Sequence, residues 1–253
     1  MLGELPAAST RRVPLPLLSE TAVEQLARQA GRSPRGLFHA TDGNPFFVTE
    51  ALESRPGETP ASVRDAVLAR LAQLSRPARA VAELVSIVPT RIERALVQSQ
   101  LGSVSAALDE CLDRGMLRAD RGSIAFRHEL ARQSVEQSLA PGRVVTMHGK
   151  MFHALRDSNG DEAELSRLVH HAERAGLVSE VLRLAPIAAT EAANASAHRE
   201  AAALYTLALQ HGDRLSPAAR ADLLEAAALE FKLIHELDRA IAAYDAALAR
   251  RSR

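Results

Sequence analysis

The sequence of 253 residues contains one cysteine, no tryptophan and only 3% aromatic residues. The single Cys111 excludes a disulfide within the chain and fits a reducing compartment, and we expect it to be a buried helix residue. Scarce aromatics beside abundant Ala and Leu favour helices packed through small side chains over an aromatic-rich β-sandwich. No apolar run reaches the ~20 residues that a membrane helix needs, so we expect a cytoplasmic protein.

A net charge is also lacking, because 31 basic residues balance 31 acidic ones. The overall charge therefore gives no indication of nucleic-acid binding. The sequence has no G-x-x-x-x-G-K-[ST] loop for phosphates and no hydrophobic strand ending in acidic residues for Mg²⁺. We therefore expect no phosphoryl transfer by this chain alone, and we do not expect it to be an enzyme.

The pattern of turn residues and apolar positions divides the chain into four parts. Residues 1–18 form an extended lead-in with three prolines. Residues 19–58 contain three short predicted helices: one over 20–30 capped by Ser19, one over 34–41, and one that starts at Asn44-Pro45. Residues 54–60 are a Pro/Gly linker. Residues 61–140 and 141–253 form the other two parts.

Residues 61–140 contain the one convincing β signal. The pattern predicts helices that begin near residues 61, 76, 91 and 103, and a last helix over 127–139. Before that last helix, Asp120-Arg121-Gly122 separates two short apolar runs and is typical of a β-hairpin turn. Several helices, a hairpin and a further helix together indicate a winged-helix-like unit.

Residues 141–253 are predicted to be helical and to contain a repeat. Residues 200–209 (EAAALYTLAL) align with residues 239–248 (RAIAAYDAAL), because their Ala, Tyr and Ala-Leu positions match. Small residues at close-packing positions are typical of tetratricopeptide (TPR) hairpins, although 239 minus 200 gives a period of 39 and the usual period is ~34. We therefore expect TPR-like repeats, and a mainly α fold with one short β-hairpin.

Gly43-Asn44-Pro45 is the first candidate site. A glycine lets the backbone approach a ligand closely, a proline offers a flat apolar face beside an adenine, and the helix start offers N–H groups to an anion. The tripeptide alone favours an ordinary turn before a helix, because Gly-Asn-Pro is common at such places.

His128 is the second candidate, at the start of the helix that follows the hairpin. Its imidazole has a pKa near neutrality and can donate a hydrogen bond to a phosphate, although a helix-start histidine bonded to backbone is the simpler interpretation. The segment from His128 to Arg132 matches half of the zinc-protease helix motif, but Arg132 replaces the second histidine. We therefore predict no metal site here.

The remaining histidine pairs are interpreted as packing or surface residues. His170 and His171 are adjacent, so they point to different faces of a helix and are expected not to chelate together. His148 and His153 are five residues apart, which is also a poor spacing for chelation. No Ser-His-Asp, Cys-His or paired-carboxylate arrangement stands out, so we predict no catalytic residue and no metal ligand.

Five segments in order carry a resemblance to a known family. They are residues 15–19 (LPLLS), 41–50 (TDGNPFFVTE), 60–71 (PASVRDAVLARL), 126–132 (FRHELAR) and 170–176 (HHAERAG). This series resembles the middle of the large bacterial LuxR-type, MalT-like transcriptional regulators that carry a STAND-class AAA ATPase core.

The resemblance implies a role for each part of the chain. Residues 19–58 would be the helical lid of the ATPase, with Gly43, Asn44 and Pro45 as its nucleotide sensor. Residues 61–140 would be a winged-helix domain, with His128 at the β-phosphate of ADP, although the related motif is Met-His-Asp. Residues 2–6 would end the last strand of an α/β domain that carries the P-loop, and residues 141–253 would begin the repeat sensor.

The resemblance also implies partners outside this chain. ATP or ADP would be held together with a P-loop domain, an inducer would bind the repeats, DNA would be bound by a C-terminal helix-turn-helix, and the protein would oligomerise. For this chain alone we expect weak or no nucleotide binding. Two alternatives remain: a protein-interaction scaffold built on the repeats, and a weak DNA binder that uses the helix near residues 103–114.

Overall fold

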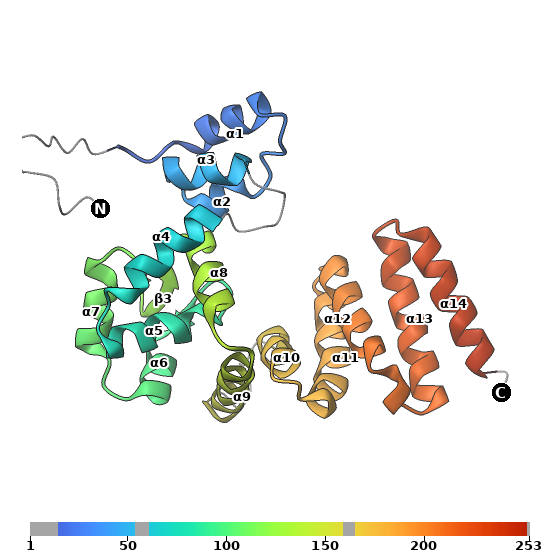
Figure 1. The fold of residues 1–253 in the computed structure, drawn as a ribbon. Coiled ribbons are helices and arrows are strands. Elements are labelled where there is room, and N and C mark those ends of the chain that lie inside the picture. Colours follow the sequence, from blue (N-terminus) through green and yellow to red (C-terminus); the bar gives the residue numbers. More distant parts are fainter. Residues whose placement is uncertain (1–14, 54–60, 159–164, 252–253) are drawn as a thin grey trace, which may run out of the picture. The chain divides into compact units, whose positions relative to one another are not determined.

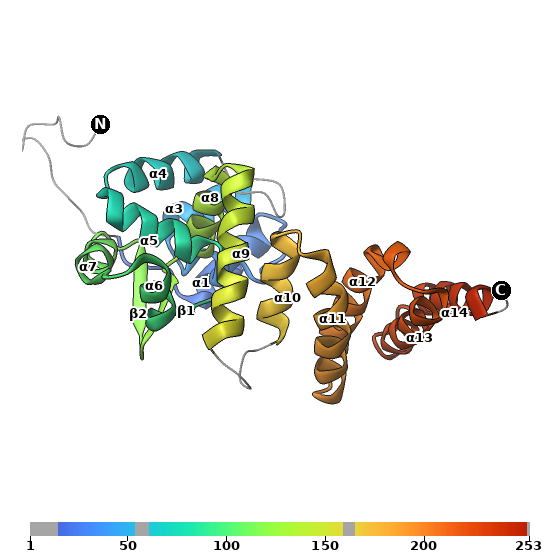
Figure 2. The same ribbon diagram turned by 90° about the horizontal axis from the view of Figure 1, so that it is seen from below.

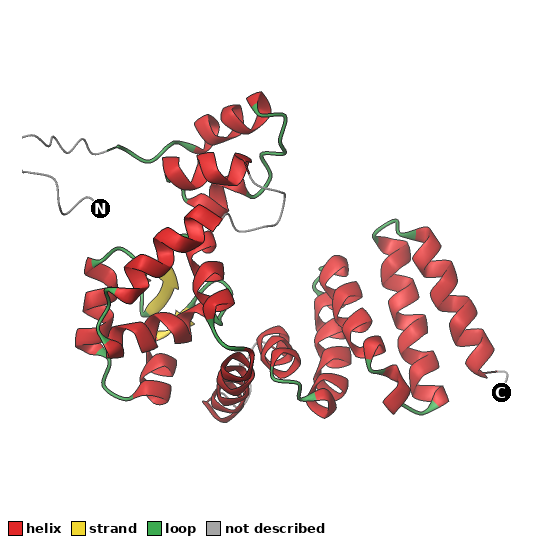
Figure 3. Ribbon diagram, viewed as in Figure 1, coloured by secondary structure: helices red, strands yellow, loops and turns green. Residues whose placement is uncertain are grey.

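The computed structural model describes residues 15–53, 61–158 and 165–251, so the predicted strand end at residues 2–6 and the linker at residues 54–60 lie outside it. Helices dominate these described ranges, and a small antiparallel sheet accompanies them (Figure 3). The prediction of a mainly α fold is therefore confirmed. The chain divides into two compact units, Met1–Leu139 and Ala140–Arg253.

The first unit begins with three short helices and continues with helices around the sheet (Figure 1). The helices of this unit are α1 (Glu20–Gln29), α2 (Leu37–Thr41), α3 (Pro45–Glu53), α4 (Ala61–Ala72), α5 (Arg76–Ser86), α6 (Arg94–Leu101), α7 (Ser105–Asp113) and α8 (Glu129–Ser138). Ser19 caps α1 as predicted, since its Oγ accepts a hydrogen bond from the Ala22 N–H at 3.2 Å.

The predicted hairpin is present as β2 (Leu117–Asp120) and β3 (Ser123–Phe126), which pair antiparallel. Arg121 and Gly122 form its two-residue turn with φ of 43° and 87°. Positive φ at both turn positions is the geometry that matches the twist of paired strands. Arg121 adopts it despite its side chain, and Gly122 adopts it without strain.

One prediction in this region is wrong in part. The helix expected to begin near residue 91 begins at Arg94, and the two residues before it form β1 (Ile92–Glu93), which pairs with β3. The sheet therefore has three strands in the order β1-β3-β2. Ile92 is fully buried and pairs with Ile124 of β3. This pairing keeps residues 92–93 extended, so they do not add a further turn to the start of α6.

The second unit is helical throughout the residues that the structure describes (Figure 2). Its helices are α9 (Pro141–Ser158), α10 (Leu165–Arg174), α11 (Val178–Asn194), α12 (His198–Gln210), α13 (Pro217–Leu233) and α14 (Leu237–Arg251), with a short 3₁₀ turn at Gly212–Arg214. Consecutive helices pack on one another, which is the arrangement expected of TPR-like hairpins.

Alanines fill the contacts between these repeat helices. Ala185, Ala189, Ala201 and Ala208 are fully buried, and their short side chains allow adjacent helices to approach closely. Tyr205 is buried, whereas a row of large apolar side chains along α13 and α14 is exposed. The most exposed of them are Leu229, Leu233, Leu237, Ile241 and Leu248. Within the described residues, no helix has the length and apolarity that a membrane crossing requires.

Candidate functional site

The junction of α2 and α3 contains Gly43, Asn44 and Pro45, and each of them makes local contacts or begins a helix there. Gly43 has a φ of +68°, and a Cβ added there would come within 2.2 Å of the Leu18 carbonyl oxygen. The Leu18 N–H also donates a hydrogen bond to the Gly43 carbonyl at 2.7 Å. The close backbone approach that the glycine permits is therefore made by Leu18 of the same chain.

Asn44 caps α3. Its Oδ1 accepts hydrogen bonds from the N–H groups of Phe46 at 3.1 Å and Phe47 at 3.3 Å. Two of the N–H groups that the sequence pattern offers to an anion are thus already used. Pro45 is the first residue of α3 and is half-buried, so part of its ring remains accessible.

The structure brings His128 against this junction. His128 precedes the first turn of α8, and its ring stands edge-on to that of Phe47, with centroids 4.9 Å apart and an interplanar angle of 85°. Thr41, at the end of α2, contributes a backbone hydrogen bond, and the charge of Asp42 also acts on the imidazole. All four predicted site residues therefore lie around the α2–α3 junction.

His128 is 7% exposed, and burial lowers its pKa below the ordinary value. Asp42 and the Thr41 backbone act in the opposite direction, while Arg127 and Arg70 reinforce the decrease. The imidazole is therefore neutral at pH 7. Its buried Nδ1 has no hydrogen-bond partner among the described residues, which is uncommon for a buried polar atom.

Glu129, the residue after His128, belongs to an ion-pair network. Glu129 pairs with Arg132 at 2.7 Å, and Arg132 also pairs with Glu136 at 2.8 Å and donates a hydrogen bond to the Ser86 carbonyl. Arg132, whose side chain is 11% exposed, thus anchors α8 to α5. Arg132 stands where the zinc-protease helix motif has its second histidine, and its part in this ion-pair network explains its presence there.

Three other histidines meet in the second unit, although the adjacency of His170 and His171 had led us to expect that they do not chelate together. Both approach His148 of α9, and the ligating atoms of the three rings all lie within 4.8 Å of one another. His153 is exposed and takes no part. Spacing along one helix could not show this, because the third ring comes from a different helix.

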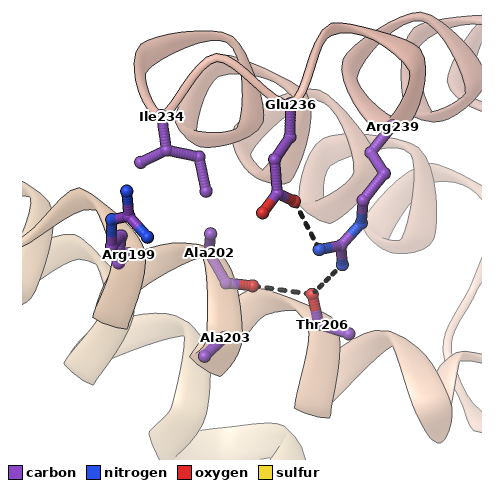
Figure 4. A pocket seen from close by; sticks show the side chains of 7 residues that line it. All are labelled: Arg199, Ala202, Ala203, Thr206, Ile234, Glu236 and Arg239. Atoms are coloured by element: carbon purple, nitrogen blue, oxygen red, sulfur yellow. Dashed lines mark hydrogen bonds and ion pairs between the residues drawn. The ribbon is translucent and has the colours of Figure 1, made fainter. Parts of the chain in front are cut away.

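A surface cavity of about 360 Å³ also lies in the second unit, between α12 and the start of α14 (Figure 4). Arg239 borders it and is held by Glu236 at 2.6 Å and by Thr206 at 3.3 Å. Its guanidinium also stacks over the Phe231 ring at 4.0 Å. Arg199 and Ile234 line the opposite part of the cavity.

Comparison with known proteins finds no family model that matches the chain. A similar curated protein is "Uncharacterized protein R02095" of Rhizobium meliloti (strain 1021), which is 27% identical over 223 residues. The match covers 76% of this chain and 22% of that protein, so the chain spans about a fifth of the length of this relative.

Among solved structures, the chain is similar to PH0952 from Pyrococcus horikoshii. That protein is described as a Signal Transduction ATPase with Numerous Domains (STAND) with a tetratricopeptide repeat sensor. The TM-score is 0.43 at 14% sequence identity, and the similarity covers 93% of this chain and 42% of that one.

Proposed function

We propose that this chain is the central sensing segment of an ATP-dependent, LuxR-type transcriptional regulator. In this proposal, residues 19–58 are the lid of its STAND ATPase core and residues 61–140 are a winged-helix domain. Residues 141–253 are then the first repeats of its sensor. The order of the five sequence segments supports the family, and the contact between α8 and the α2–α3 junction supports the site.

The observation that carries the proposal is the buried imidazole of His128. Its Nδ1 has no partner among the described residues, although the ring lies beside Asp42 and Phe47 of the lid segment. A buried nitrogen without a partner costs free energy, and a ligand oxygen at this position would remove that cost. A phosphate would supply such an oxygen, and its negative charge would raise the lowered pKa of the imidazole, so that a protonated Nδ1 could donate the hydrogen bond.

The α2–α3 junction would position this contact and would not itself cradle the phosphates. Asn44 already caps α3, and the Leu18 carbonyl fills the space beside Gly43. The accessible part of Pro45 and the exposed ring of Phe46, which the sequence pattern did not single out, remain for apolar contact with a base. The phosphate loop would belong to a P-loop domain outside this segment.

In such a regulator, the nucleotide state would set the contact between α8 and the lid. ADP would favour the closed arrangement, and exchange for ATP together with an inducer would favour release and oligomerisation. The inducer would act on the repeat unit, which offers the cavity beside Arg199 and Arg239. Its volume of about 360 Å³ lies within the range of ~300–1,000 Å³ typical of small-molecule sites.

The test has two arms. The gene upstream of Met1 should encode a Walker A loop in frame, and in a polypeptide that includes it, His128→Gln should weaken ADP binding at least tenfold. His153→Gln, at an exposed position of α9, is the matched control and should leave ADP binding unchanged. Unchanged ADP affinity in His128→Gln would contradict the proposed site.

For this chain alone, the proposal predicts weak or no nucleotide binding and no hydrolysis. Calorimetric titration with ATP checks this, and a micromolar affinity would contradict it. Direct DNA binding is not part of the proposal. The helix α7 carries Asp109, Glu110 and Asp113, and the adjacent Arg114 is already hydrogen-bonded to Gln73, so this helix is poorly suited to phosphate contact.

A protein-interaction scaffold is the second candidate function. The exposed apolar side chains along α13 and α14, such as Leu237 and Ile241, favour it because large apolar side chains grouped on one surface commonly mark contact sites. Co-purification of a stable partner, in particular a P-loop protein encoded nearby, with loss of binding in Ile241→Glu would support this function over the first.

A further inference from the structure

His148, His170 and His171 bring three imidazoles together within the second unit. His148 belongs to α9, and the other two belong to α10. The ligating atoms lie within 4.8 Å of one another, and the Nδ1 atoms of His148 and His171 are 2.8 Å apart. The ring centroids are separated by 5.4, 4.9 and 5.1 Å for the three pairs.

His170 and His171 are adjacent in α10, and both approach His148 because it belongs to the neighbouring helix α9. Successive side chains of a helix are ~100° apart, so both can approach a partner that faces the sector between them. His171 is buried against α9, while His170 is half-buried at the edge of the contact. His148 lies within reach of both.

A hydrogen bond joins His148 and His171, and the His170 ring stands edge-on to both of their rings. Three neutral imidazoles are a common zinc ligand set, with the fourth tetrahedral position open to water or another group. Zn–N distances of about 2.05 Å at tetrahedral angles imply N···N separations of about 3.3 Å. The shortest nitrogen pair would open by about 0.5 Å and the widest would close by at most about 1.5 Å, which are movements that side-chain rotation supplies.

We propose that His148, His170 and His171 form a zinc-binding site that ties α9 to α10. His170 is half-buried and gives the site access to solvent. The site does not depend on the proposed nucleotide function, because all three ligands belong to the second unit.

The state of the buried ring agrees with this chemistry. Burial lowers the pKa of His171 to about 2, with further contributions from His170, His148 and Arg167. The ring is therefore neutral at physiological pH, as a metal ligand must be. The positive charge of Arg167 opposes a cation at this place, so the three nitrogen ligands must supply the affinity.

Zinc titration of the chain, prepared without a histidine tag, tests the proposal. Calorimetry should show one site per chain, and Co²⁺ substituted for zinc should give the intense visible absorption of tetrahedral coordination. His170→Gln should lower zinc affinity at least about tenfold, on the scale of disturbed zinc sites. His153→Gln is the matched control, since it removes an exposed histidine of α9, the helix that carries His148, and it should bind zinc like the parent.

Thermal unfolding provides a second readout, so the test does not rely on zinc affinity alone. The only two tyrosines, Tyr205 and Tyr244, both lie in the second unit, so their fluorescence reports its unfolding. Zinc should raise the melting temperature followed in this way, and His170→Gln should reduce the increase while circular dichroism confirms that it folds. Equal zinc affinity in parent and His170→Gln, or an octahedral Co²⁺ spectrum, would overturn the proposal.

Discussion

The imidazole of His128 stands edge-on to the ring of Phe47, with the centroids 4.9 Å apart. Both residues are buried, at 7% and 3% exposure. Phe47 belongs to α3 and His128 precedes α8, so this contact joins two segments that are far apart in the sequence. The start of α8 therefore packs directly on the helix that Pro45 begins.

Acid should destabilise the first unit through His128. Burial lowers the folded-state pKa of this residue, so its contribution to stability is lost as pH falls below the unfolded value of about 6.5. NMR titration should place the His128 pKa below 6.5. Unfolding of parent and His128→Gln at pH 7 and pH 5 should show the larger acid-induced loss in the parent, and a pKa above 6.5 would contradict the prediction.

Gly43→Ala should destabilise the first unit more than Gly36→Ala. Both glycines have positive φ, but the new Cβ at position 43 would meet the Leu18 carbonyl oxygen at 2.2 Å, whereas the one at position 36 would have nothing within 4 Å. Backbone strain alone costs about 1 kcal/mol, and the clash should add roughly 1–3 kcal/mol at position 43. Urea denaturation measures both, and equal losses would show that the loop moves away from Leu18.

Arg132→Met should lower the free energy of unfolding by about 3 kcal/mol. This is near the lower end of the cost of breaking a buried ion pair, because Glu129 and Glu136 keep some contact with water. Arg251→Met is the control: Arg251 also pairs with two carboxylates, those of Asp222 and Glu225, but on the exposed surface. Denaturation should show no measurable change for this control.

Cys111 should be unreactive toward thiol reagents in the folded chain. Burial raises the pKa of its thiol to about 12, with a smaller contribution from Glu110, and its Sγ contacts the Ala78 carbonyl oxygen at 3.2 Å. A disulfide reagent at pH 8 should therefore label the chain only after denaturant is added. Rapid labelling of the native chain would show that α7 opens away from α5.

The local elements of the fold could largely be predicted from the sequence. Ser19 before an apolar pattern indicated the start of α1, and Arg121-Gly122 indicated the hairpin turn, because caps and turns depend on residues that are close in the chain. The two-residue strand β1 was missed. Its only reason to be extended is its pairing with β3, and that has no local signal.

The candidate site remains a prediction in its function, and the structure shows which groups of its residues are already used. The sequence indicated Gly43, Asn44, Pro45 and His128, and the structure gathers them around one junction. It also shows that Gly43 accommodates Leu18 and that Asn44 caps its own helix, which leaves His128 as the candidate donor to a ligand. Which groups remain available depends on contacts that the motif does not encode.

The sequence by itself determined the helices, the hairpin and the small-residue repeat, since each follows from interactions between near neighbours in the chain. Only the tertiary structure decided which side chains meet across helices. It placed His128 on Phe47 and gathered His148, His170 and His171 into one cluster. Such meetings depend on how two helices cross, and that is set by the packing of whole helix faces and not by the spacing of residues along one helix.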